Sequence, residues 1–145
     1  MYLHIIAVLV ASLSGGMTST DILPVSETAF GIWSAVCSED GCDEWMAGAL
    51  ASTAAEESRA NGSLVHGDHG LACGRFQLHA EWRQGHPCKE LEDDAELDAR
   101  LARDAIVTLE KHCRSKKGAL AAYASGKCDQ AMNYAERRCA AAGGC

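Results

Sequence analysis

The chain of 145 residues is long enough for one domain with its own hydrophobic core. Its composition, 48% hydrophobic and 23% charged, is typical of a globular protein and excludes a disordered one. The formal net charge of −7 argues against nucleic acid as a partner, because binding to phosphates requires clustered Lys and Arg side chains. The same acidity mildly disfavours attraction to an anionic cell wall without excluding it.

The N-terminal segment has the pattern of an export signal. Residues 3–13 form a short apolar run, which Ser14-Gly15-Gly16 follows, and a run of this length is too short to span a membrane. We therefore predict a signal peptide over residues 1–16, a mature domain over residues 17–145, and a secreted or periplasmic protein without stable membrane insertion. Because no Lys or Arg precedes the run, a buried N-terminal helix and a retained membrane anchor are the alternatives.

The cysteines are numerous and even in number. Such a set in a short chain predicts a disulfide framework that forms in an oxidising compartment. Short sequence separations favour the pairs 37/42, 73/88 and 113/128, and we expect a disulfide to hold the C-terminal residue, but the sequence leaves the connectivity open. The eight cysteines are Cys37, Cys42, Cys73, Cys88, Cys113, Cys128, Cys139 and Cys145.

The first half of the chain combines one strong helix signal with loops. Residues 17–42 are expected to form a surface lead-in with one apolar stretch at residues 30–36. A helix is predicted over residues 43–60, with Asp43 as N-cap and Asn61-Gly62 as its stop. Gly, Asp and His residues predict a loop or short hairpin over residues 61–75, and the next few residues fit either a strand or the start of a helix.

Three further helices are predicted in the second half. Asp93 is the expected N-cap of the first, with Glu96 as its capping-box partner, and apolar residues at spacings of three and four extend this helix to about residue 113. A shorter helix is predicted over residues 118–125, ending at Gly126, and the last over residues 128–139. The predicted fold is a single, small, disulfide-rich domain that is mainly α with a loop-rich middle.

One acidic residue departs from the pattern of the helix predicted over residues 43–60. On a helical wheel Met46 and Leu50 belong to an apolar stripe, and Glu57 lies near the middle of that stripe. Burial and the negative end of the helix dipole would both favour a protonated carboxyl group, which can act as general acid in glycosidic cleavage. The alternative is a carboxylate that reaches water or pairs with Arg59 or Arg75.

Motifs around Glu57 resemble the lysozyme-like superfamily. Glu57-Ser58 is followed by G-R-F-Q-L at residues 74–78, which is similar to the catalytic E-S and downstream G-L-x-Q-[LIV] of soluble lytic transglycosylases. A-A-Y-A-S-G at residues 121–126 resembles their A-Y-N-A-G motif, with Ala124 in place of the Asn. The resemblance covers about residues 46–126 and implies an α+β lysozyme-like fold with a glycan-binding cleft.

The resemblance also implies an activity and residue roles. Glu57 would protonate the β-1,4-glycosidic bond between N-acetylmuramic acid and N-acetylglucosamine in peptidoglycan. A lytic transglycosylase can work with one Glu, which serves as acid and then as base, so no cofactor or metal is expected. We also expect the protein to be a monomer. The expected substrate-binding residues are Ser58, Gln77, Tyr123 and Trp82.

A second resemblance concerns Asp68. Residues 68–78 are similar to the D-x-x-x-S-C-G-x-F-Q-I segment of invertebrate-type lysozymes, in which the Asp is the second carboxylate that a retaining hydrolase needs. The alternatives to a transglycosylase are therefore a muramidase that uses Asp68 and a non-catalytic secreted glycan-binding protein. For Asp68 itself, the competing interpretation is a structural role in a turn. A zinc site in the H-x2-H-x3-C segment at residues 66–73 is disfavoured because its spacing matches no zinc finger.

Overall fold

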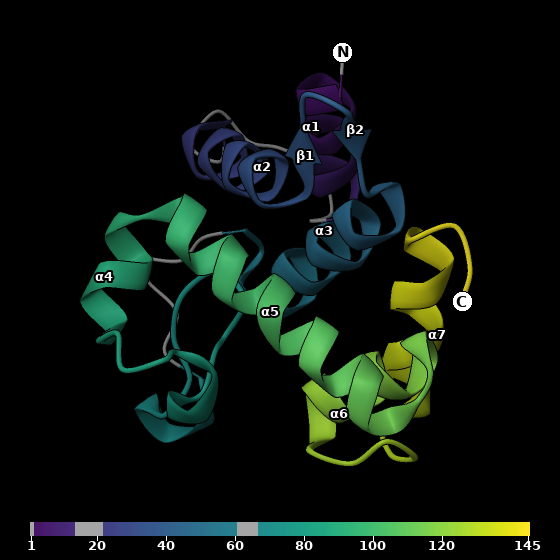
Figure 1. Cartoon of the computed structure of the whole chain (residues 1–145). Coiled ribbons are helices and arrows are strands. Elements are labelled where there is room, and N and C mark those ends of the chain that lie inside the picture. Colours follow the sequence, from purple (N-terminus) through teal and green to yellow (C-terminus); the bar gives the residue numbers. More distant parts are fainter. Residues whose placement is uncertain (1, 14–21, 61–66) are drawn as a thin grey trace.

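The computed structural model describes residues 2–13, 22–60 and 67–145, and its fold is mainly helical (Figure 1). Strands β1 (Cys37–Ser38) and β2 (Gly41–Cys42) form one short antiparallel hairpin. The α-helices are α1 (Tyr2–Leu13), α2 (Ile22–Val36), α3 (Glu44–Ser58), α4 (Cys88–Asp93), α5 (Ala95–Cys113), α6 (Lys116–Ser125) and α7 (Met132–Ala141), and the 3₁₀ helices are η1 (Asp68–Gly70) and η2 (Ala80–Trp82). A mainly α, disulfide-rich domain is thus confirmed.

Helix α5 runs through the middle of the molecule and connects its two sides (Figure 1). It packs against α2 on one side and α6 on the other, while α7 lies against α6 and α3. Most of the largest fully buried apolar side chains come from these helices and from the loop before α4, and they include Ile32, Leu50, Phe76, Leu101 and Leu120. One continuous core therefore holds the helices and the loop-rich middle together.

Helix α3 is buried on almost every side. Asp43 caps it as predicted, by accepting a hydrogen bond from the backbone N–H of Met46 at 2.9 Å. Every residue from Met46 to Ala55 is buried, so the single apolar stripe expected for this helix is wrong. Small side chains let neighbours approach on several faces: a Cβ atom on Gly48 would lie 2.6 Å from the Cα atom of Ala142, next to α7.

Several helix boundaries differ from the sequence prediction: α6 begins at Lys116 and not at residue 118, and α7 spans Met132–Ala141 and not residues 128–139. Helix α3 ends at Ser58, because Arg59 takes a left-handed conformation (φ 53°) and its N–H bonds carbonyl groups of the last turn. The predicted stop at residues 61–62 lies outside the described residues. The N-cap of α5 is Asp94 and not Asp93, which ends α4, because the Asp94 carboxylate accepts the N–H groups two and three residues further on.

The surface lead-in expected for residues 17–42 is also wrong, since most of its described part forms helix α2. Val25, Ala29 and Ile32 recur at helical spacing, are buried, and belong to the core. Phe30 and Trp33 remain exposed on the same helix, with ring centroids 5.9 Å apart. Helix α2 therefore carries apolar residues on both its buried and its exposed faces.

The N-terminal apolar segment forms helix α1, which packs against α2 and α3. Ile6 and Val10 are buried there. This packing corresponds to the alternative of a buried N-terminal helix, and the signal peptide over residues 1–16 stays a prediction. Among the residues that the structure describes, no helix has the length and hydropathy that a membrane span requires.

Four disulfides link the elements. The pairs predicted from short separations, 37/42, 73/88 and 113/128, are confirmed, and Cys145 is bonded to Cys139. The Cys73–Cys88 bond ties the start of α4 to the loop that contains Phe76 and η2. The segment between these two cysteines contains no α-helix, and we expect the covalent link to restrict its conformations in the unfolded chain.

Removal of the Cys73–Cys88 disulfide should lower the free energy of unfolding more than removal of the Cys37–Cys42 disulfide, which closes a smaller loop. The variant Cys73→Ala/Cys88→Ala loses a link of sequence separation 15, for which chain entropy predicts a loss of about 3 kcal/mol. The matched variant Cys37→Ala/Cys42→Ala loses a link of separation 5 and should lose about 2 kcal/mol. Urea unfolding of the oxidised proteins measures both, and the reverse order would contradict the prediction.

Candidate functional site

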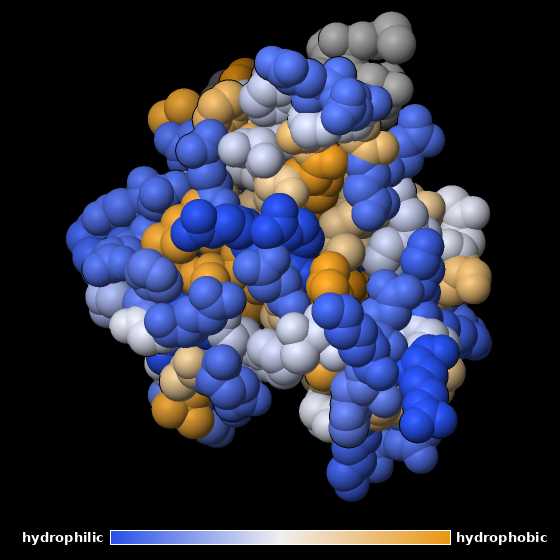
Figure 2. Space-filling view, in the orientation of Figure 1, coloured by the Kyte–Doolittle hydropathy of each residue, from blue (hydrophilic) through white to orange (hydrophobic). Residues whose placement is uncertain are grey.

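Two adjoining cavities open between the segment of residues 67–82 and α6. Their volumes are about 440 and about 380 Å³, and they share Asp68, Gln77, His79, Tyr123 and Ala124 as lining residues. We call the combined space the central groove. Figure 2 shows a hollow at the lower edge of the molecule. It lies between the lobe that Figure 1 draws in teal at the lower left and the lobe that contains α6.

Five of the six residues predicted from the sequence as site residues line the central groove. Glu57 comes from the last turn of α3 and Tyr123 from α6, so helices separated in sequence both contribute to the lining. Asp68 belongs to η1, Trp82 to η2, and Gln77 to the loop between them. The fold thus brings together residues that the sequence analysis selected by motif alone.

Ser58 is the residue that the structure does not bring to the groove. Its side chain is buried, and its hydroxyl group bonds the carbonyl oxygen of Arg75 at 2.7 Å. It therefore ties the end of α3 to the loop that contains Gln77. In this position Ser58 supports the groove from behind, whereas the sequence analysis expected it to contact substrate.

Glu57 forms an ion pair that the sequence analysis missed. Its Oε1 atom accepts a hydrogen bond from Nη2 of Arg138 at 2.5 Å, and Nε of the same arginine donates to Glu56 at 3.0 Å. The Arg138 side chain is fully buried, while that of Glu57 is 26% exposed. The partner is thus Arg138 of α7, and not Arg59 or Arg75. This ion pair ties the last turn of α3 to α7.

Arg138 is held in an aromatic and acidic environment. Its guanidinium carbon lies 5.8 Å from the ring centroids of both Tyr123 and Tyr134, within the range of cation–π attraction. Its position three residues after the buried Ala135 is the sequence signal that could have identified it, because that spacing places a charged residue on the apolar face of α7.

Tyr123 connects the two walls of the groove. Its hydroxyl group donates to the carbonyl oxygen of Phe76 at 2.8 Å. Burial raises the pKa of Tyr123 well above 10, and the negative charge of Glu57 adds to this rise. The phenol is therefore a neutral hydrogen-bond donor that holds α6 against the loop, rather than an ionised group.

Gln77 lines both cavities, but its amide group is engaged by backbone. Its side-chain oxygen accepts from the N–H of Gly67 at 2.7 Å, and its side-chain nitrogen donates to the carbonyl of Gly74 at 2.9 Å. The residue has a left-handed backbone conformation, with φ 50°. These bonds close the loop of residues 67–77, so Gln77 shapes the groove wall in addition to any contact with substrate.

Asp68 and His79 face each other at the mouth of the groove. The Oδ2 atom of Asp68 lies 3.5 Å from Nε2 of His79, and both side chains are largely open to solvent. Asp68 shares the lining of the larger cavity with Glu57. Trp82 lies further along the groove, partly buried against the core, with an exposed part directed to the lining.

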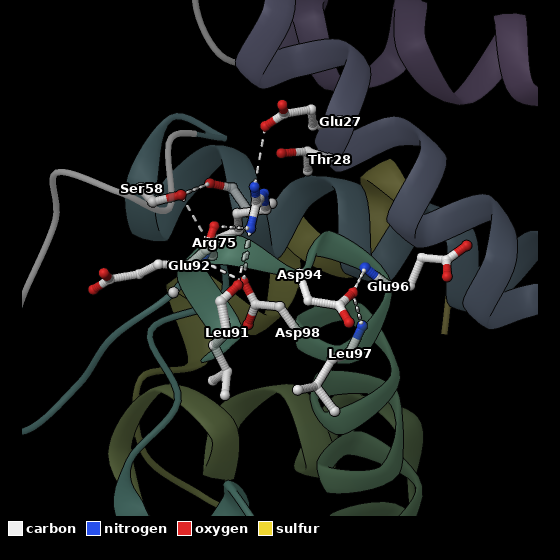
Figure 3. A network of polar contacts seen from close by, with 12 residues as sticks. Glu27, Thr28, Ser58, Arg75, Leu91, Glu92, Asp94, Glu96, Leu97 and Asp98 are labelled. Carbon is white, nitrogen blue, oxygen red and sulfur yellow. Dashed lines mark hydrogen bonds and ion pairs between the residues drawn. The ribbon is translucent and has the colours of Figure 1, made fainter. Parts of the chain in front are cut away.

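The Gly74-Arg75 pair within the resemblance motif forms an internal brace (Figure 3). The backbone N–H of Arg75 donates to Asp98 at 2.7 Å, and its guanidinium donates to the carbonyl of Leu91 at 3.1 Å and pairs with Glu27 at 3.3 Å. Gly74 has φ +79°, and a Cβ atom there would lie 2.6 Å from the Asp98 carboxylate. This brace fixes the loop that carries Gln77, so these two positions act through packing.

Asp98 should make the stability of the protein depend on pH. Burial raises the pKa of its carboxyl group from 3.8 to about 7, although the N–H and guanidinium of Arg75 partly oppose the rise. The folded state therefore binds the proton of Asp98 more tightly than the unfolded chain does. The resulting contribution to the free energy of unfolding is fully present below pH 3.8 and is lost as the pH rises to about 7.

The measurement is urea unfolding of the wild type and Asp98→Asn at pH 5 and pH 8. We expect the free energy of unfolding of the wild type, relative to that of the variant, to fall by roughly 2 kcal/mol between these pH values. Equal changes in the two proteins would contradict an origin in Asp98.

The zinc alternative loses its thiol ligands in this structure. Cys73 and Cys88 are joined in a disulfide, and within residues 2–13, 22–60 and 67–145 no three metal-binding side chains are grouped to hold an ion. His66 lies outside the described residues.

Comparison of the chain with protein-family models, with curated proteins and with solved structures finds no match.

Proposed function

We propose that the protein cleaves the β-1,4-glycosidic bond between N-acetylmuramic acid and N-acetylglucosamine in peptidoglycan, with Glu57 as its acid–base residue. The observation that carries this proposal is the convergence of Glu57, Asp68, Gln77, Trp82 and Tyr123 on one groove from three separate parts of the chain, namely α3, the segment of residues 67–82 and α6. The four disulfides support an extracytoplasmic location, where such a substrate is accessible.

The proposed reaction begins at the carboxyl group of Glu57. A sugar bound in the groove excludes water and competes with Arg138 for this carboxyl group, which then gives its proton to the glycosidic oxygen as the bond to the anomeric carbon breaks. The carboxylate next accepts the proton of the sugar's own 6-hydroxyl group, whose oxygen bonds the anomeric carbon. The product is a 1,6-anhydro sugar, and Glu57 regains its proton for the next cycle.

Hydrolysis is the second candidate, and the position of Asp68 favours it. A retaining hydrolase needs a second carboxylate on the groove, and Asp68 lines the same cavity as Glu57 with His79 beside it. In this mechanism water takes the place of the 6-hydroxyl group, and the product has a reducing end.

Mass spectrometry of the muropeptides released from purified peptidoglycan by the oxidised wild type tests both candidates. Anhydro-muramyl ends support transglycosylation, in which case Asp68→Asn should retain activity. Reducing ends support hydrolysis, in which case Asp68→Asn should lose it. If nothing is released while the protein still sediments with peptidoglycan, the enzyme proposal fails and a non-catalytic glycan-binding protein takes its place.

A further inference from the structure

The charges on the central groove are all acidic, apart from one imidazole. Its charged lining consists of the carboxylates of Glu57, Asp68 and Glu81 together with His79, and no Lys or Arg belongs to the described lining. Residues 61–66, which precede this segment and are not described, contain neither Lys nor Arg. A ligand with anionic groups would therefore meet repulsion along the groove, and a ligand with cationic groups would meet attraction.

Arg138, the cation that pairs with Glu57, does not neutralise the open part of the groove. Arg138 is fully buried behind Glu57 and divides its hydrogen bonds between Glu56 and Glu57. The side chain of Asp68 is 54% exposed and, among the described residues, pairs with the imidazole of His79. Glu81 is exposed and forms no ion pair with any described residue. Two carboxylates at the mouth of the groove are thus available to a cationic ligand.

A second cavity of the molecule has a different charge distribution. This cavity, of about 370 Å³, lies between α2 and the start of α5, and its lining includes Arg100 and Arg103 beside acidic residues. The net charge of −7 therefore does not by itself remove cations from every concave surface of the molecule.

We infer that the central groove prefers β-1,4-linked glycans in which a sugar next to the cleaved bond carries a free amino group instead of an N-acetyl group. This inference rests on the proposed function, in which the groove holds a glycan. A protonated amine of glucosamine would lie between the carboxylates of Asp68 and Glu81, while Trp82 offers its ring to the sugar. Two polymers supply this chemistry: peptidoglycan that has lost N-acetyl groups and partly deacetylated chitin.

The test is calorimetric binding of a glucosamine tetramer and an N-acetylglucosamine tetramer to the full chain at pH 6 and low ionic strength. We expect the amine-bearing tetramer to bind roughly tenfold tighter, with the difference disappearing in high salt. Glu81→Gln should reduce the preference roughly threefold. The matched variant Glu39→Gln makes the same change of charge in the exposed β1–β2 turn, at the opposite end of the molecule in Figure 1, and should leave the preference unchanged.

Each outcome separates this inference from the proposed function. Equal or tighter binding of the acetylated tetramer overturns the inference, as does an equal loss of preference in both variants. Cleavage of fully acetylated peptidoglycan without any amine preference refutes the inference alone. An amine preference without cleavage of any glycan retains the inference and refutes the enzyme, and no binding of either tetramer refutes both. Peptidoglycan and chitin, each compared before and after N-deacetylation, then show which polymer supplies the amine.

Discussion

Replacement of Glu57 by Gln should reduce glycan cleavage by roughly 10²–10⁴-fold, the usual contribution of a general acid–base residue. Gln keeps the size of the side chain but has no acidic proton to give to the glycosidic oxygen. The rate at which muropeptides are released from peptidoglycan measures the effect. Because Glu57 also pairs with Arg138, the circular dichroism and unfolding midpoint of the variant must be compared with those of the wild type.

The neighbouring acidic residue provides the matched control. Glu56 is adjacent in α3, is similarly exposed, and bonds the same Arg138, but it does not line the central groove. Glu56→Gln should therefore disturb Arg138 to a similar degree and retain most of the activity. If both variants lose activity equally, the loss comes from the ion-pair cluster, and Glu57 has no special role in catalysis.

Much of the helical fold follows from local signals in the sequence. The cap at Asp43, the stop at Gly126 and the apolar spacing of residues 95–113 all correspond to helix ends and faces of the structure. Each of these signals depends on residues close together in the chain, so a single sequence is enough to predict them. Helix α2 was missed because exposed apolar residues such as Phe30 and Trp33 hide the polar face that normally reveals an amphipathic helix.

The site was predictable in its members but not in their interactions. The motifs selected Glu57, Gln77 and Tyr123, which do lie on one groove. Their partners come from distant segments, and nothing local in the sequence pairs Arg138 with Glu57. A signal was nevertheless present, because Asp98 and Arg138 each interrupt the apolar face of a helix, and both are fully buried.

The central part of the motif has a different use from the one expected. Within residues 74–78, Gln77 was expected from the sequence to bind a glycan. In the structure Arg75 faces inward to Asp98, and Gln77 bonds the backbone of Gly67 and Gly74. The buried side of this segment determines the shape of the groove. A motif residue can therefore be required for that shape without contacting substrate.

Replacement of Arg138 by Met should destabilise the protein by about 3 kcal/mol, near the lower end of the range for breaking a buried ion pair. The lower end applies because Glu56 and Glu57, at 23% and 26% exposure, can turn partly toward water once the arginine is gone. Arg137 is the matched control, because it is the adjacent residue, is exposed, and pairs only with Glu56. Arg137→Met should leave the urea midpoint unchanged.

A double-mutant cycle then tests whether Arg138 acts on Glu57 in particular. If the arginine positions this carboxylate, Arg138→Met should cost less stability in the Glu57→Gln background than in the wild type, because the negative charge of Glu57 is already absent. Arg138→Lys keeps the charge but lacks the planar fork that contacts both carboxylates, so it should restore stability only in part and should leave cleavage slower than in the wild type. Additive losses in the cycle would show that Arg138 contributes by packing between α7 and α3, independently of Glu57.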